Sequence, residues 1–191
     1  MDTHPVVVMP ADAPVLDLTT RTHFPTRHRW SIGRYDEDRA VYTQALFAAE
    51  AGAARTIHVG IDLGGPAGVA VHAFADGVVV QAGVNPAPGD YGPTLITRHE
   101  WDGGPLWALH GHLSPESLTR SPVGRRLRAG DVLGWLGAPE DNGGWPPHVH
   151  FQLSVVEPTT HDLPGVVSRT ERASALRRYP DPRTVLGPLY R

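Results

Sequence analysis

After residue 55 the chain alternates between short, apolar, β-prone runs and clusters of glycine, proline, asparagine and aspartate. Short runs with regular turn signals are typical of antiparallel β-sandwiches and barrels. Asp102-Gly103-Gly104, between two of these runs, predicts a tight β-hairpin. We therefore predict a mainly β fold with an antiparallel sandwich or barrel core. The predicted strands are Ile57–Leu63, Ala67–Phe74, Gly77–Val84, Thr94–His99, Leu106–His112, Val132–Leu136 and Val149–Val155.

The segments on either side of this β region follow other patterns. Residues 1–29 are rich in proline and threonine without a clear period, which predicts an extended arm on the domain or a partly disordered segment. Trp30–Arg34 predicts a short strand, and Asp36–Ala54 predicts a helix because its apolar residues recur on one face. A short helix is predicted over Thr170–Arg178. The predicted division is an N-terminal arm and helix packing on the domain (1–54), a β domain (55–156) and a C-terminal extension (157–191).

The composition narrows the range of functions. A net charge of -3 gives no electrostatic argument for nucleic acid or an anionic membrane as partner. The chain has no cysteine, so its metal ligands must be histidine, aspartate or glutamate. The first residues lack the basic and apolar regions of a signal peptide, and no window approaches the length of a membrane span. We expect a cytoplasmic protein, with export by an unrecognised route as the alternative.

Candidate chemistry begins with two pairs of histidines. His148 and His150 are two residues apart in a β-prone run, so in an extended strand both imidazoles point to the same face. His110 and His112 have the same spacing. Two imidazoles that face one space can hold a metal ion, or one of them can bind the ion while the other moves protons.

A third motif adds a carboxylate to this set. His58 and Asp62 are four residues apart, which is about 13 Å in an extended strand. They can share one ion only if the backbone bends between them, and Gly60 allows such a bend. Two imidazoles and a carboxylate suit zinc, and they also suit iron or manganese. Three such motifs in one small β domain favour a metal site.

These motifs occur in an order that resembles a known family, the M23 (lysostaphin/LytM-type) zinc metallopeptidases. The similarity covers about residues 55–155. The matching segments are Arg55-x-x-His58-x-Gly60-x-Asp62, Ala73-x-x-Asp76-Gly77-x-Val79, His110-Gly111-His112-Leu113-Ser114, the glycine-punctuated hairpin over 124–137 and Pro147-His148-Val149-His150-Phe151.

The resemblance implies an antiparallel β core of the duplicated hybrid motif type and one catalytic zinc ion. His58, Asp62 and His150 correspond to the zinc ligands of the family, with water in the fourth position. His112 and His148 correspond to its catalytic histidines. Strand geometry alone leaves open which of His148 and His150 is the ligand, so this assignment rests on the family.

The sequence departs from the family pattern near the site. His110 stands where the family often has tyrosine, and Asn142-Gly143-Gly144-Trp145-Pro146-Pro147 replaces its usual approach to the last two histidines. We expect His110, Asn142 and Trp145 to contact substrate. The variant segment, with Asn85–Gly92 upstream, is similar to M23 domains embedded in cytosolic multidomain proteins that carry kinase-like and aminotransferase domains.

The predicted function is zinc-dependent hydrolysis of a peptide bond in a glycine-containing or peptidoglycan-derived substrate. The sequence also allows two alternative functions. One is a metal-stabilised binding or regulatory module without hydrolytic activity, and the other is a cytosolic small-molecule amidase. A further hypothesis is that the arm over residues 1–29 plugs the groove as a self-inhibitor.

Overall fold

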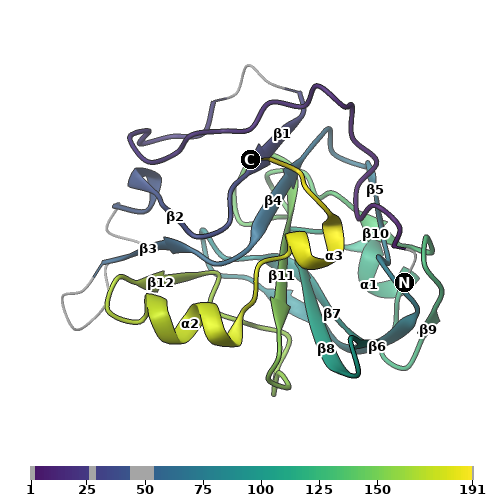
Figure 1. Cartoon of the computed structure of the whole chain (residues 1–191). Coiled ribbons are helices and arrows are strands. Elements are labelled where there is room, and N and C mark those ends of the chain that lie inside the picture. Colours follow the sequence, from purple (N-terminus) through teal and green to yellow (C-terminus); the bar gives the residue numbers. More distant parts are fainter. Residues whose placement is uncertain (1–2, 26–28, 44–53, 191) are drawn as a thin grey trace.

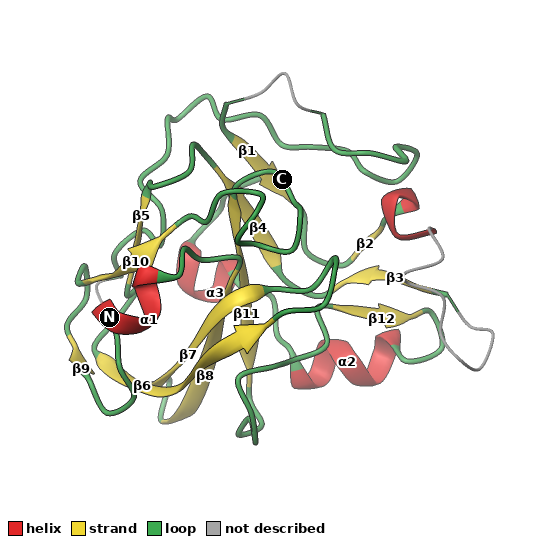
Figure 2. Ribbon diagram, turned by 180° about the vertical axis from the view of Figure 1, so that it is seen from behind, coloured by secondary structure: helices red, strands yellow, loops and turns green. Residues whose placement is uncertain are grey.

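An antiparallel β-sheet forms the centre of the molecule, which confirms the predicted mainly β fold (Figures 1 and 2). The computed structural model describes residues 3–25, 29–43 and 54–190. Within these residues the largest sheet has 7 strands. In spatial order they are β1 (Ser31–Gly33), β4 (Ile61–Gly64), β11 (His148–Ser154), β8 (Gly104–Gly111), β7 (Gly92–Trp101), β6 (Gly77–Asn85) and β9 (Arg126–Leu127).

Two smaller sheets flank this one. In the first, β5 (Ala70–His72) pairs with β10 (Val132–Trp135), and α1 (Glu116–Arg120) packs beside β10. In the second, β3 pairs with β2 on one side and with β12 on the other. Both views show α2 alongside β12 (Figures 1 and 2). The remaining bounds are β2 (Glu37–Asp38), η1 (Ala40–Thr43), β3 (Arg55–His58), β12 (Val166–Ser168), α2 (Arg172–Arg178) and α3 (Arg183–Leu186).

Strand β11 separates the hydrophobic core from the site. Val149 and Phe151 are fully buried in the main core, where the Phe151 ring meets Phe74 edge-on at 5.9 Å between centroids. His148 and His150 line a pocket on the opposite face. The predicted alternation along this strand is therefore confirmed, and it places both imidazoles in the same space.

Two predictions of local structure depend on glycine. Asp102 and Gly103 form the turn between β7 and β8 with φ of 49° and 83°, so the predicted tight hairpin is confirmed. The run predicted as one strand over Ile57–Leu63 is divided into β3 and β4 by a bend at Gly60. This bend brings His58 and Asp62 together, as expected if both serve one ion.

The helix predicted over Asp36–Ala54 is wrong at its beginning. Glu37 and Asp38 instead pair with His58 and Ile57 of β3, and a short 3-10 turn follows. The main-chain N–H of Arg39 donates to the carbonyl of Thr56 at 2.9 Å. Pairing with a distant strand thus overrides the local apolar spacing. Residues 44–53 lie outside the described part of the chain.

Both ends of the chain pack against the β region. Val6 and Val7 of the N-terminal arm are buried in the main core, and Val15 forms an isolated bridge with Ile32 of β1. The predicted strand at Trp30–Arg34 is confirmed as β1, and the predicted C-terminal helix is confirmed as α2. In the part of the chain that the structure describes, no helix is both long and apolar enough to cross a membrane.

Candidate metal centre

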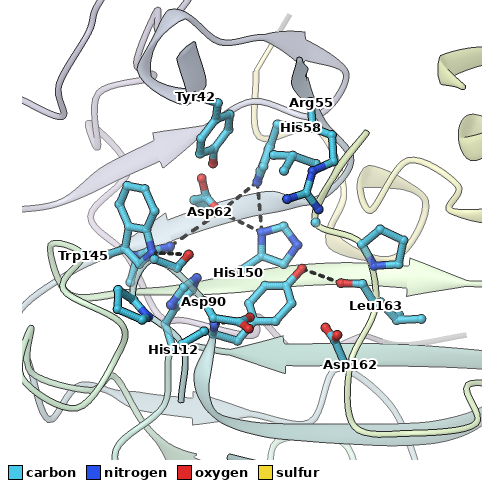
Figure 3. A pocket seen from close by; sticks show the side chains of 18 of the residues that line it. Tyr42, Arg55, His58, Asp62, Asp90, His112, Trp145, His150, Asp162 and Leu163 are labelled. Carbon is cyan, nitrogen blue, oxygen red and sulfur yellow. Dashed lines mark hydrogen bonds and ion pairs between the residues drawn. The ribbon is translucent and has the colours of Figure 1, made fainter. Parts of the chain in front are cut away.

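Three predicted ligands meet at the ends of neighbouring strands. His58 ends β3, Asp62 lies in β4, and His150 lies directly opposite Asp62 in β11. His58 Nε2 is 2.9 Å from His150 Nδ1, and each of these nitrogens is 3.2 Å from Asp62 Oδ1. All three side chains are buried. Figure 3 shows them converging on one point at the base of a pocket.

In His58 and in His150, the ring nitrogen that points away from the other imidazole (the outer nitrogen) donates a hydrogen bond to a protein acceptor. His58 Nδ1 donates to the carbonyl of Arg34 at 2.9 Å. His150 Nε2 donates to Gln152 Oε1 at 2.9 Å, while the Gln152 amide nitrogen donates to the carbonyl of Pro164. In neutral rings the inner nitrogens therefore carry lone pairs that point at one another. A buried arrangement of two lone pairs and a carboxylate oxygen is a donor set for a cation.

The size of this donor triangle fits a transition-metal ion. Four ligands at about 2.0–2.1 Å from a tetrahedral zinc ion are separated from one another by about 3.3 Å. The three inner atoms of His58, Asp62 and His150 are already 2.9–3.2 Å apart. The residues present thus match the spacing and the chemistry that a His–Asp–His zinc site requires.

The other oxygen of Asp62 faces away from the two imidazoles. Arg39 Nη1 donates to Asp62 Oδ2 at 2.7 Å, and the Arg39 side chain is fully buried. Burial alone raises the pKa of Asp62, but His58 and Arg39 outweigh it and hold that pKa well below its usual range. The carboxylate is therefore ionised at neutral pH and turns only Oδ1 towards the imidazoles.

The two predicted catalytic histidines lie side by side at the edge of the same donor set. The rings of His112 and His148 are 4.3 Å apart between centroids. His112 Nδ1 donates to the carbonyl of Asn142 at 2.8 Å, and His148 Nδ1 donates to that of Pro146 at 2.7 Å. Their Nε2 atoms remain as proton acceptors, and His148 Nε2 is 3.8 Å from Asp62 Oδ1.

Burial keeps the imidazoles of His58, His112 and His148 neutral. Loss of hydration, together with the charge of Arg39, lowers the pKa of His58 to about 4. Burial and the neighbouring His148 lower the pKa of His112 well below its usual value, and burial also lowers that of His148. At neutral pH each ring therefore has one nitrogen that can bind an ion or accept a proton.

The sequence model of peptidase family M23 matches residues 56–161, which includes all five of these side chains. The chain belongs to peptidase family M23. It is thus a peptidase-family protein with a His–Asp–His site.

Several solved peptidase structures resemble the chain at low identity. A zinc-containing peptidase from Vibrio cholerae is 25% identical with a TM-score of 0.42, over 51% of this chain and 27% of that one. The catalytic domain of lysostaphin from Staphylococcus simulans is 24% identical with a TM-score of 0.45, over 70% and 81%. A mutant catalytic domain of the prophage-encoded M23 protein EnpA from Enterococcus faecalis is 22% identical with a TM-score of 0.48, over 81% and 95%. Among curated proteins, none matches the chain.

The M23 site opens into a pocket of about 270 Å³ (Figure 3). Phe24 of the N-terminal arm, Tyr42 and Trp145 contribute aromatic rings to its wall. The Trp145 indole N–H donates to the carbonyl of Gly89 at 3.0 Å, which fixes the ring at the rim. The structure thus brings Trp145 to the pocket, where contact with substrate was expected.

Asn142 is placed differently from the expectation. Its side chain is fully buried and does not line the pocket. Its amide donates to the carbonyls of Gly137 and Trp145 and accepts from the main-chain N–H of Trp145, while its own carbonyl accepts from His112. Asn142 therefore shapes the loop that positions His112 and Trp145.

His110 lies on the opposite side of the sheet from the pocket. Its ring packs against Phe151 at 5.2 Å between centroids, and both of its nitrogens are buried with no hydrogen-bond partner among the described residues. The equal spacing of His110 and His112 suggested a shared face. However, β8 ends at Gly111, and His112 has a φ of 62°, so the strand alternation stops before it. His110 is not brought to the metal centre.

Three residues that support the ligands were not identified from the sequence. Arg39 holds Asp62, Gln152 holds His150, and the Arg34 carbonyl holds His58. Gln152 is two residues beyond His150 on the same strand face, so strand alternation was a signal that could have found it. Arg39 and Arg34 come from a segment upstream of the region matched by the family model.

Proposed function

We propose that the chain is a zinc-dependent endopeptidase that hydrolyses peptide bonds in glycine-containing or peptidoglycan-derived substrates. His58, Asp62 and His150 hold the ion in this proposal, and His112 and His148 are the catalytic histidines. The observation that carries it is the convergence of two imidazole lone pairs and one carboxylate oxygen, beside two further imidazoles whose Nε2 atoms are free to accept a proton.

A bound divalent ion supplies a Lewis acid and makes water acidic enough to lose a proton near neutral pH. His112 and His148 provide the proton acceptors next to that position. Their Nδ1–H groups are fixed on the carbonyls of Asn142 and Pro146, so their Nε2 atoms keep a constant direction during the reaction. After accepting a proton, the same Nε2–H can stabilise negative charge on the scissile carbonyl or protonate the leaving amine.

The pocket supports a substrate with small side chains. Its volume of about 270 Å³ is below the usual range for a drug-sized ligand, and aromatic rings narrow one wall. Tyr91 is held against His150 by a hydrogen bond from its hydroxyl to the carbonyl of Leu163 at 3.0 Å. In this proposal the rings disfavour a bulky residue at the scissile bond and favour glycine.

The proposal is tested by metal content and peptide cleavage in the same preparations. Wild-type protein should contain about one zinc ion per chain and cleave at least one member of a panel of glycine-rich peptides and muropeptides. His150→Ala should lose both the zinc and the cleavage. His112→Ala should keep the zinc and lose cleavage. A wild-type protein that is folded but binds no zinc contradicts the proposal.

The same experiment separates hydrolysis from binding alone. A metal-stabilised binding module would hold zinc in the wild type and in His112→Ala, and neither protein would cleave any peptide. Cleavage of small amides without cleavage of peptides would instead identify an amidase that uses the same metal chemistry.

A further inference from the structure

Arg39 is an arginine whose side chain has no exposed surface. Burying a guanidinium costs several kcal/mol unless its donors are satisfied. Arg39 satisfies them with four groups. Nε donates to Glu37 Oε2 at 3.0 Å, Nη1 to Asp62 Oδ2 at 2.7 Å and to the Tyr42 hydroxyl at 3.1 Å, and Nη2 to the Arg34 carbonyl at 3.1 Å.

This network reaches two of the three proposed ligands. Arg39 contacts the carboxylate of Asp62 directly. The Arg34 carbonyl that accepts from Arg39 also accepts from His58 Nδ1. Arg39 therefore orients Asp62 directly, and it also holds the Arg34 carbonyl that orients His58.

The charge of Arg39 is balanced locally. Glu37 is also buried, and its other carboxylate oxygen accepts from the main-chain N–H of Leu18 at 3.2 Å. Glu37 offsets part of the positive charge, and Arg39 in addition holds one oxygen of Asp62 in place. A lysine offers a single point of contact and cannot reproduce the fork that spans Glu37 and Asp62.

Close packing also holds the Arg39 guanidinium against the Asp62 carboxylate. A Cβ added at Gly33 of β1 would lie 2.7 Å from Arg39 Nη2 and 2.8 Å from Asp62 Oδ2. Strand β1 therefore carries a glycine at the point where the guanidinium and the carboxylate meet. Both β1 and Arg39 precede residue 56, where the match to the family model begins.

We infer that Arg39 is a positioning residue that makes Asp62 a one-oxygen metal ligand, and that the segment upstream of the family-matched region thereby sets the metal affinity. The inference rests on the proposed function only in that the site holds a metal ion. With Asp62 Oδ2 held by Arg39, Oδ1 alone faces the ion. Without Arg39, both carboxylate oxygens are free to turn towards it.

The test measures metal binding rather than turnover. Zinc affinity is measured by competition with a chromogenic chelator, and the Co2+-substituted protein is examined by visible absorption. Arg39→Met should weaken zinc binding by about tenfold to a hundredfold, the range for loss of a group that orients a ligand. Its Co2+ absorption should also fall, because five-coordinate Co2+ absorbs visible light less strongly than four-coordinate Co2+.

Two further variants keep the test informative if Arg39→Met fails to fold. Arg39→Lys retains the charge and should give an affinity between those of Arg39→Met and wild type. Gly33→Ala removes no charged group, but its methyl group displaces the Arg39 guanidinium and the Asp62 carboxylate. It should therefore also weaken zinc binding. Folding is followed by circular dichroism and thermal unfolding of the metal-free proteins.

A control arginine is available outside the residues that line the pocket. Arg125 is partly buried and donates to Ser121 Oγ and to the carbonyl of Val132. Arg125→Met removes a comparable set of arginine contacts, and it should leave zinc affinity and the Co2+ spectrum unchanged.

The outcomes separate this inference from the proposed function. If folded Arg39→Lys and Gly33→Ala bind zinc as tightly as wild type, with the same Co2+ spectrum, Arg39 has no positioning role and the inference is wrong while the peptidase proposal stands. If wild-type protein itself binds no zinc, the peptidase proposal fails first. Weaker binding in all three site variants but not in Arg125→Met supports the inference.

Discussion

His58 Nε2 and His150 Nδ1 lie 2.9 Å apart, although neither nitrogen carries a proton when its ring is neutral. The protons of both rings are on the far side, where they are held by the Arg34 carbonyl and by Gln152. Two lone pairs at this distance repel each other unless a cation or a shared proton lies between them. The protein therefore holds its two imidazoles in an arrangement that a bound ion stabilises.

Zinc should raise the thermal stability of the wild-type protein. Binding to the folded state alone contributes about 4 kcal/mol when free zinc is a thousandfold above its Kd. Thermal unfolding with added zinc should thus occur at a higher temperature than in EDTA. The difference should disappear in His58→Ala, and a shift of equal size in that variant would show that zinc acts elsewhere.

Gln152 should contribute to metal affinity through His150. Its Oε1 accepts from His150 Nε2, which fixes the tautomer that leaves Nδ1 available. Gln152→Leu should weaken zinc binding by about tenfold to a hundredfold. Asn85→Leu is the matched control, because Asn85 is also a buried amide that donates to a carbonyl of the same loop, at His161, without contacting a ligand. Equal losses of zinc affinity in both variants would contradict the prediction.

Gly60 should be required for the position of His150. A Cβ at this residue would lie 2.6 Å from His150 Nε2 and 3.0 Å from the Phe151 carbonyl. Gly60→Ala should therefore displace the imidazole, weaken zinc binding, and destabilise the fold by about 1–3 kcal/mol through overpacking. Gly104→Ala, where a Cβ meets no atom within 4 Å, serves as the control for the added methyl group. Denaturant unfolding and chelator competition measure the two effects.

His110 should make the fold sensitive to acid. Burial, with a smaller contribution from His99, lowers the pKa of His110 from 6.5 to about 3. A histidine whose pKa is lowered by folding stabilises the protein fully above pH 6.5, and this contribution decreases as the pH falls towards 3. Between pH 6.5 and 4 the loss amounts to about 3 kcal/mol at most, since each pKa unit is worth about 1.4 kcal/mol.

His110→Leu should therefore flatten the dependence of unfolding free energy on pH over this range. It also removes two buried nitrogens for which the described part of the chain offers no hydrogen-bond partner, so stability at pH 7 should not fall. His99→Leu is the contrasting variant, because His99 bonds to Thr97 Oγ1 and to the Asp76 carbonyl, and it should lose stability at pH 7. An unchanged acid profile in His110→Leu would contradict the prediction.

The sequence predicted those parts of the candidate site whose residues lie close together in short motifs. Strand alternation and one bend at a glycine predicted that His58 and Asp62 share a site with the pair His148 and His150, and the choice of His150 as ligand rested on the resemblance to the family. The structure brings His58, Asp62 and His150 together. The structure places His110, which was expected to contact substrate, away from the pocket for a geometric reason. A left-handed φ at His112 is not visible in the residue spacing, and it turns two histidines of equal spacing to different faces.

Arg39 could not be predicted because its role depends on long-range pairing. It lies inside a segment whose apolar spacing predicts a helix, and in a helix its side chain would face water. Only the ladder with β3 shows that the segment is extended, and that ladder is formed with residues about 20 positions away along the chain. Local pattern carries no information about such a partner, so a buried arginine appears in the sequence as an ordinary surface charge.

The three-stranded sheet has a consequence for how this protein can be divided. Strand β3 carries His58, and its two neighbours, β2 and β12, both lie outside residues 56–161. A fragment limited to those residues would leave both edges of β3 open, with unpaired main-chain groups that promote aggregation. The segment that matches the family model is therefore shorter than the segment that must stay together for β3 to be paired. A transfer of this domain into another protein has to include β2 and β12.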